Sequence, residues 1–81
     1  MMQLYVWDQC PFCHKVLQAA AEIGLTEGQD FQSVAAGPGT PGRLLVQSLG
    51  GKAMVPFLVD GETKLYESDD IIAYLRTHTD E

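Results

Sequence analysis

The hydrophobic positions along the chain fall into short blocks that predict alternating strands and helices. The apolar run from Leu4 to Trp7 is rich in β-forming residues and predicts a buried strand over residues 3–7. Apolar residues then recur at helical spacing, which predicts a helix over Pro11–Ile23 with Gly24 as its C-terminal stop.

The second half of the chain continues the alternation. Residues 35–42 hold three glycines and two prolines and are expected to form a loop. The other predicted elements are a strand at 31–34, a helix at 43–49, a strand at 55–59, a hairpin turn at Asp60-Gly61, a strand at 64–66 and a helix capped by Ser68. The β-α-β-α-β-β-α order predicts an α/β fold with a four-stranded mixed sheet and three helices, its first strand pair parallel and its last antiparallel.

The composition limits the size of the protein and its partners. The chain has 81 residues, enough for one small domain. Five Lys/Arg and eleven Asp/Glu give a net charge of −6, which argues against a nucleic-acid partner because phosphate neutralisation needs a basic surface. The chain has neither an apolar run of the ~18 residues that a membrane span needs nor a secretory signal at its N-terminus. We therefore expect a cytoplasmic monomer without a membrane partner.

The strongest chemical signal is the pair Cys10 and Cys13 at the start of the first helix. Side chains three apart on a helix lie about 5–6 Å apart at Cβ, close to disulfide distance. The free N–H groups and positive end of a helix stabilise a thiolate, the nucleophilic form of cysteine. Cys10, before the first turn, is expected to be the exposed nucleophile, and Cys13 the more buried resolving thiol.

Two other uses of these cysteines remain open from the residues alone. Cys10, Cys13 and His14 match the C-x-x-C-H haem-attachment pattern, although haem attachment normally requires an exported chain. A zinc site needs four ligands, and the only other histidine, His78, lies near the end of the chain. We expect no metal.

Three motifs in order resemble a glutaredoxin. They are Cys10-Pro11-Phe12-Cys13 after a short strand, Met54-Val55-Pro56 at the third strand, and Glu67-Ser68-Asp69-Asp70 at the last helix. The likeness covers essentially the whole chain and implies a thioredoxin fold. Residues 4–10 and 67–75 are most similar to the glutathione S-transferase-like glutaredoxins, which carry a helical second domain. This chain ends before one could begin, so we expect a single domain over residues 1–81.

The resemblance implies a glutathione site beside Cys10. In that family the residue before the conserved proline pairs its backbone with the cysteinyl unit of glutathione; here it is Val55, and the Val55–Pro56 bond is expected to be cis. The N–H groups of Ser68 and Asp69 would bind the γ-glutamyl carboxylate, and the Asp69 side chain the ammonium. The remaining candidates are Lys52 or Lys15 for the glycine carboxylate, and Phe12 between the cysteines.

The implied activity is that of a glutathione-dependent thiol–disulfide oxidoreductase. Its partners would be glutathione, as reductant and co-substrate, and proteins that carry disulfides or glutathione mixed disulfides. Two positions depart from the family: Trp7 stands where many glutaredoxins have lysine, and Met54 where most have threonine. The missing lysine removes a positive charge near the thiolate. The alternative function is a transferase-like glutathione-binding module, or an iron–sulfur carrier, without disulfide turnover.

Overall fold

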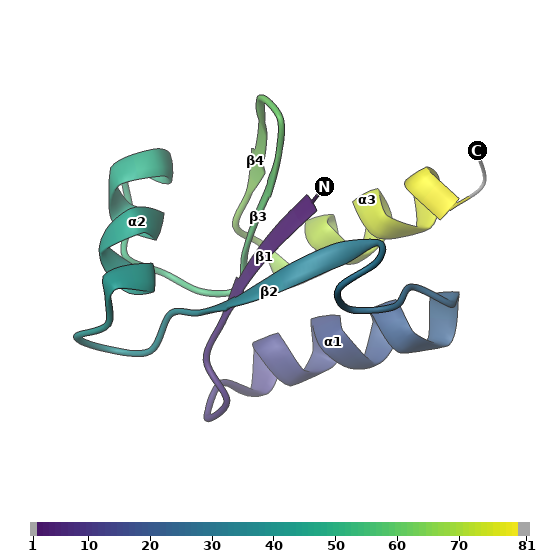
Figure 1. The fold of residues 1–81 in the computed structure, drawn as a ribbon, viewed down its shortest axis with the longest axis horizontal. Helices are drawn as coiled ribbons and strands as arrows, with labels where there is room; N and C mark the ends of the chain where they lie inside the picture. The colour runs from purple at the N-terminus through teal and green to yellow at the C-terminus, as the bar shows by residue number, and fades with distance from the viewer. Residues whose placement is uncertain (1, 80–81) are drawn as a thin grey trace.

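The computed structural model describes residues 2–79 and confirms the α/β class (Figure 1). The elements are β1 (Met2–Val6), α1 (Pro11–Ile23), β2 (Phe31–Ala35), α2 (Pro41–Gly50), β3 (Phe57–Asp60), β4 (Thr63–Leu65) and α3 (Ser68–Thr79). The strands form one sheet in the order β2-β1-β3-β4. β1 is parallel to β2, and β3 is antiparallel to both β1 and β4, as the chain order predicts.

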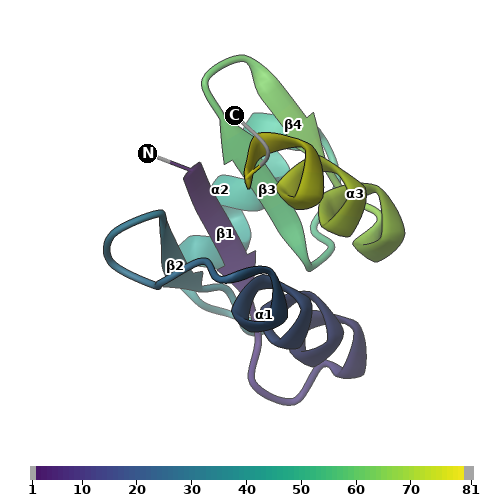
Figure 2. The ribbon, with the colours of Figure 1, turned by 90° about the vertical axis from the view of Figure 1, so that its right-hand side faces the viewer.

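The three helices cover the two faces of the sheet unequally. α1 and α3 lie side by side on one face, and α2 lies alone on the other (Figures 1 and 2). Side chains alternate along β1, so Leu4 faces the α1/α3 layer and Tyr5 faces α2. None of the described helices combines the length and apolar character needed to cross a membrane.

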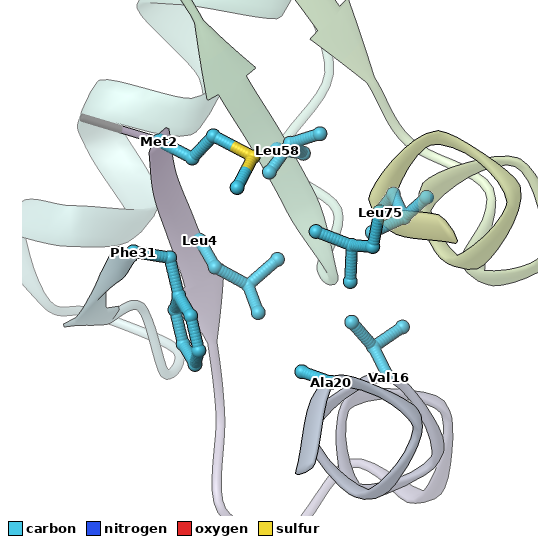
Figure 3. Close-up of a cluster of buried hydrophobic side chains, with 8 residues drawn as sticks. Met2, Leu4, Val16, Ala20, Phe31, Leu58 and Leu75 are labelled. Carbon is cyan, nitrogen blue, oxygen red and sulfur yellow. The ribbon is translucent and has the colours of Figure 1, made fainter. Parts of the chain in front are cut away.

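The larger part of the core lies between the sheet and α1 and α3. In Figure 3, Leu4 and Phe31 of the sheet lie on the face covered by α1, Val16 and Ala20 of α1 point back toward the sheet, and Leu75 of α3 completes the same cluster. A smaller cluster under α2 is formed by Tyr5, Ala36, Val46 and Phe57. β1 and β3 lie between the two clusters. The site described below is formed by segments that adjoin the ends of these two strands.

The starts of α2 and α3 differ from the predictions, and hydrogen bonds of the first helical turn explain both differences. α2 begins at Pro41 rather than at residue 43, because the Thr40 side chain caps the helix by accepting a hydrogen bond from the Arg43 N–H at 3.2 Å. α3 begins at Ser68 itself. The Ile71 N–H donates to the Glu67 carbonyl at 2.9 Å, so Glu67 rather than Ser68 takes the cap position.

The strand predictions are correct to within two residues at each end. The third strand begins at Phe57 and not at residue 55, because Val55 and Pro56 precede the paired ladder and proline has no N–H to donate to it. β1 and β4 each lie one residue earlier than predicted, and β2 extends one residue further.

Candidate thiol site

The first turn of α1 places Cys10 at the positive end of the helix. Cys10 is the N-cap, with extended backbone angles (φ −100°, ψ 115°), and Pro11 follows at the first helical position. The Cys10 side chain makes no capping hydrogen bond, and the first turn holds no acidic residue that would neutralise the helix end. The sulfur is therefore half-buried, uncommitted to the helix, and beside the free N–H groups at the helix N-terminus.

Cys13 lies one turn further on and is fully buried, as its spacing predicts. The Trp7 N–H points at Cys13 Sγ at a distance of 3.5 Å. Burial raises the pKa of the Cys13 thiol to about 12, against a smaller lowering by this hydrogen bond. Both cysteines are free thiols in this structure. Cys10 is thus the more accessible of the two thiols.

The segment before β3 brings Val55 to Cys10. The Val55–Pro56 peptide bond is cis, as expected. The Cys10 thiol lies 3.9 Å from the Val55 carbonyl oxygen, across 45 residues of sequence. The structure thus joins the cysteine motif to the proline motif, the two parts of the site that the sequence places far apart.

The start of α3 lies against α1 through an ion pair that the sequence did not indicate. Lys15 Nζ lies 2.6 Å from Asp69 Oδ1, and both side chains are largely exposed. Lys15, one of the two candidates for the glycine carboxylate, is thus paired with Asp69, the residue expected to bind the γ-glutamyl end. Ser68 is half-buried at the first position of α3, and its neighbour Asp70 is exposed.

Lys52 lies on the loop that follows α2, and Tyr66 holds its backbone. The Tyr66 hydroxyl accepts a hydrogen bond from the Lys52 N–H at 2.9 Å and lies 2.7 Å from the Lys52 carbonyl oxygen. Lys52 Nζ also lies 5.9 Å from the centre of the Tyr66 ring. Phe12 is 60% exposed between the two cysteines, where it can contact a bound partner.

Sequence reasoning missed Tyr66 and Arg43, whose side chains bond backbone carbonyl groups around the site. It also missed a cavity of about 480 Å³ between the β1–α1 turn and the β2–α2 loop. Trp7, His14 and Gly37 line this cavity, but neither sulfur does. Among the described residues, no group of three or more His, Cys, Asp or Glu side chains could hold a metal ion; the side chain of His78 lies outside this description.

The sheet order, the helix layers and the cis proline beside a helix-capping cysteine define a thioredoxin-like domain. Residues 4–81 match the family described as "Glutathione S-transferase, N-terminal domain", and the chain belongs to that family. No curated protein matches the chain.

Three solved transferases illustrate the likeness. A trimeric glutathione transferase from Leishmania is 32% identical, with a TM-score of 0.74 over 91% of this chain and 16% of its own. A delta-class enzyme from Nilaparvata lugens is 26% identical, with a TM-score of 0.81 over 98% of this chain and 36% of its own. An unclassified Bombyx mori transferase is 24% identical, with a TM-score of 0.77 over 94% of this chain and 34% of its own. The chain thus spans about a third or less of the length of these relatives.

Proposed function

We propose that this domain binds glutathione and uses Cys10 and Cys13 for glutathione-dependent thiol–disulfide exchange, as the resemblance to glutaredoxins implies. The observation that carries the proposal is the position of the half-buried Cys10 sulfur, at the N-terminus of α1 and 3.9 Å from the Val55 carbonyl. Cys13 lies buried one turn below it. A structural disulfide is a weaker explanation, because the loop between these two cysteines is too short to stabilise the chain much.

In the one-thiol reaction, the Cys10 thiolate attacks the glutathione sulfur of a protein–glutathione mixed disulfide. The protein sulfur leaves as a thiolate and takes a proton, and glutathione stays bonded to Cys10. The thiolate of a second glutathione then attacks that sulfur. This releases oxidised glutathione and restores the Cys10 thiolate.

In the two-thiol reaction, Cys10 first forms a mixed disulfide with the substrate. Cys13 then attacks the Cys10 sulfur, and the Cys10–Cys13 disulfide forms. The substrate is released as a dithiol, reduced by two electrons. Because burial raises the pKa of Cys13 to about 12, it is a protonated thiol at neutral pH. We therefore expect the attack by Cys13 to be slower than the attack by Cys10.

Glutathione would lie across the site with its polar groups matched to those of the protein. The Val55 backbone would pair with the cysteinyl unit, next to the cis bond to Pro56. The N–H groups of Ser68 and Asp69 at the start of α3 would bind the γ-glutamyl carboxylate, and the Asp69 carboxylate would accept from the ammonium. Lys52 would then bind the glycine carboxylate.

A second candidate is glutathione transfer to an electrophile, supported by the match of residues 4–81 to transferase N-terminal domains. In that reaction the sulfur of bound glutathione attacks the electrophile directly, and no disulfide forms. Cys10 would position that sulfur without bonding to it, and Cys13 would have no chemical role.

One pair of assays on the same preparation separates the two candidates. The first follows reduction of a small glutathione mixed disulfide, with and without added glutathione, and the second follows conjugation of glutathione to an aryl halide. Reduction that depends on both glutathione and Cys10, with no conjugation above the uncatalysed rate, supports the oxidoreductase. Conjugation without disulfide reduction would instead favour the transferase.

A further inference from the structure

Arg43, the third residue of α2, joins the two loops that flank this helix. Its Nε donates a hydrogen bond to the Ala36 carbonyl at 2.7 Å, and its Nη1 donates to the Ala53 carbonyl at 3.0 Å. Ala36 follows β2, whereas Ala53 lies between α2 and β3. One half-buried guanidinium therefore fixes the chain on both sides of α2.

The close approach of α2 to the end of β2 makes this bridge possible. A Cβ atom at Gly42 would lie only 1.9 Å from the Ala35 carbonyl oxygen, so only glycine permits this packing. Thr40 caps the helix and also donates from its hydroxyl to the Gly37 carbonyl at 2.7 Å. These contacts hold Arg43 within reach of Ala36.

Each of the two bonded carbonyl groups lies next to a segment that contacts one of the thiols. On one side, the Ala36 N–H donates to the Val6 carbonyl at 2.8 Å. Trp7, which follows Val6 in the chain, directs its N–H at Cys13 Sγ. On the other side, Ala53 is two residues before Val55, whose carbonyl lies 3.9 Å from Cys10 Sγ.

The charge of Arg43 is a minor influence on the thiols. Burial is the main influence on the pKa of Cys13 and raises it to about 12, and the positive charge of Arg43 is the smallest of the influences that lower it. We therefore attribute the effect of Arg43 on the site to its hydrogen bonds.

We propose that Arg43 is the positioning residue of the thiol site, holding the Trp7 segment against Cys13 and the Val55 segment against Cys10. The effect of Arg43 on turnover rests on the function proposed above. The effect of Arg43 on the backbone does not depend on that function. The two effects can therefore be measured separately.

The test compares Arg43→Gln and Arg43→Lys with Lys64→Gln, which removes an exposed positive charge from the edge strand β4. The first measurement is amide hydrogen exchange in the full chain. Arg43→Gln is expected to speed exchange at the Trp7 N–H and across residues 53–55 about tenfold, because the bonds to both loops are lost. Lys64→Gln should leave these rates unchanged. Equal rates in Arg43→Gln and Lys64→Gln would overturn the positioning role, whether or not the protein turns over glutathione.

The second measurement is the KM for glutathione in the reduction of a small glutathione mixed disulfide. Arg43→Gln is expected to raise this KM about tenfold, since the Val55 segment is released.

Arg43→Lys separates charge from position and also guards against a misfolded glutamine variant. Lysine keeps the charge but is a point donor that does not bridge two carbonyl groups as the guanidinium does. We expect both the KM and the exchange rates across residues 53–55 to stay raised in the lysine variant. A lysine variant that restores both quantities fully would overturn the bridging role.

Discussion

The Tyr66 hydroxyl forms hydrogen bonds with both the N–H and the carbonyl group of Lys52. It thereby links the segment just before α3 to the loop that follows α2. The same oxygen lies 3.3 Å from the Val46 carbonyl, and the Tyr66 ring packs against Phe57 with ring centres 4.5 Å apart. The position of Lys52 is therefore set by a residue 14 positions away, adjacent to the motif that begins at Glu67.

Tyr66→Phe should lower the free energy of unfolding by about 1–2 kcal/mol, since it leaves the ring in place and removes these hydrogen bonds. Urea unfolding measures this loss. If the loop also presents Lys52 to glutathione, the KM for glutathione should rise. Tyr74→Phe is the matched control, because it breaks the 2.6 Å bond from the Tyr74 hydroxyl to Asp60, away from the thiols. Equal effects of the two variants on KM would contradict the role given to Lys52.

Gly42→Ala should destabilise the fold by about 3 kcal/mol or more, because the new methyl group meets a backbone oxygen that does not move independently. Gly39→Ala is the control. Gly39 has φ +79° with open space around it, so the cost there is only the backbone strain of about 1–2 kcal/mol. Thermal or urea unfolding of both variants tests this ranking, and a larger loss at Gly39 would show that α2 can move away from β2.

Cys10→Ser should abolish turnover of glutathione mixed disulfides, because it removes the nucleophile. Cys13→Ser should retain that reaction and lose the two-thiol reduction of protein disulfides. Rates on both substrates, measured for both variants, check the assignment. Retained turnover in Cys10→Ser together with its loss in Cys13→Ser would reverse the two roles.

Asp69→Ala should weaken glutathione binding roughly 10- to 150-fold, the effect of about 1.5–3 kcal/mol from one charge-assisted hydrogen bond to the ligand ammonium. The fold should lose little stability, because the Lys15–Asp69 ion pair is exposed and such pairs contribute about 0–1 kcal/mol. Asp70→Ala, one residue further along α3, is the control. Turnover of both variants is measured against glutathione concentration. An equal or larger effect of Asp70→Ala would show that Asp69 is not the residue that binds the γ-glutamyl ammonium.

Alkaline pH should destabilise the fold through Cys13. Its pKa is raised from 9.0 to about 12 by burial, so the unfolded chain loses this proton above about pH 9 while the folded chain keeps it. Stability contributed by Cys13 therefore falls between these pH values, by about 1.4 kcal/mol for each pH unit. The difference in unfolding free energy between the parent and Cys13→Ala, measured from pH 8 to 10.5, isolates this contribution from other titrating groups. A pH-independent difference would contradict the burial of the thiol.

The order of elements and the thiol pair could be predicted from the sequence because both depend on local patterns. The continuous apolar run of β-forming residues at 4–7 indicates a strand, and the Cys10-Pro11 pair marks the start of a helix. The contacts between Arg43 and Ala53, Tyr66 and Lys52, and Lys15 and Asp69 could not be predicted, because they form only after packing brings distant loops together. The start of α2 was placed two residues late because Pro41 and Gly42 are equally typical of a loop, and only the Thr40 cap decides between them.

The unequal division of the core has a consequence for how the domain opens. α1 and α3 share a large apolar cluster, whereas α2 buries mainly Gly42 and Val46 and leaves Leu44, Leu45 and Leu49 substantially exposed. Since α2 buries few apolar side chains, we expect it to separate from the sheet at a lower free energy than α1 or α3, together with the Lys52 loop. The domain would then sample a partly unfolded form in which the thiol helix stays intact while the opposite face of the sheet is uncovered, and proteases would cut first within residues 41–55.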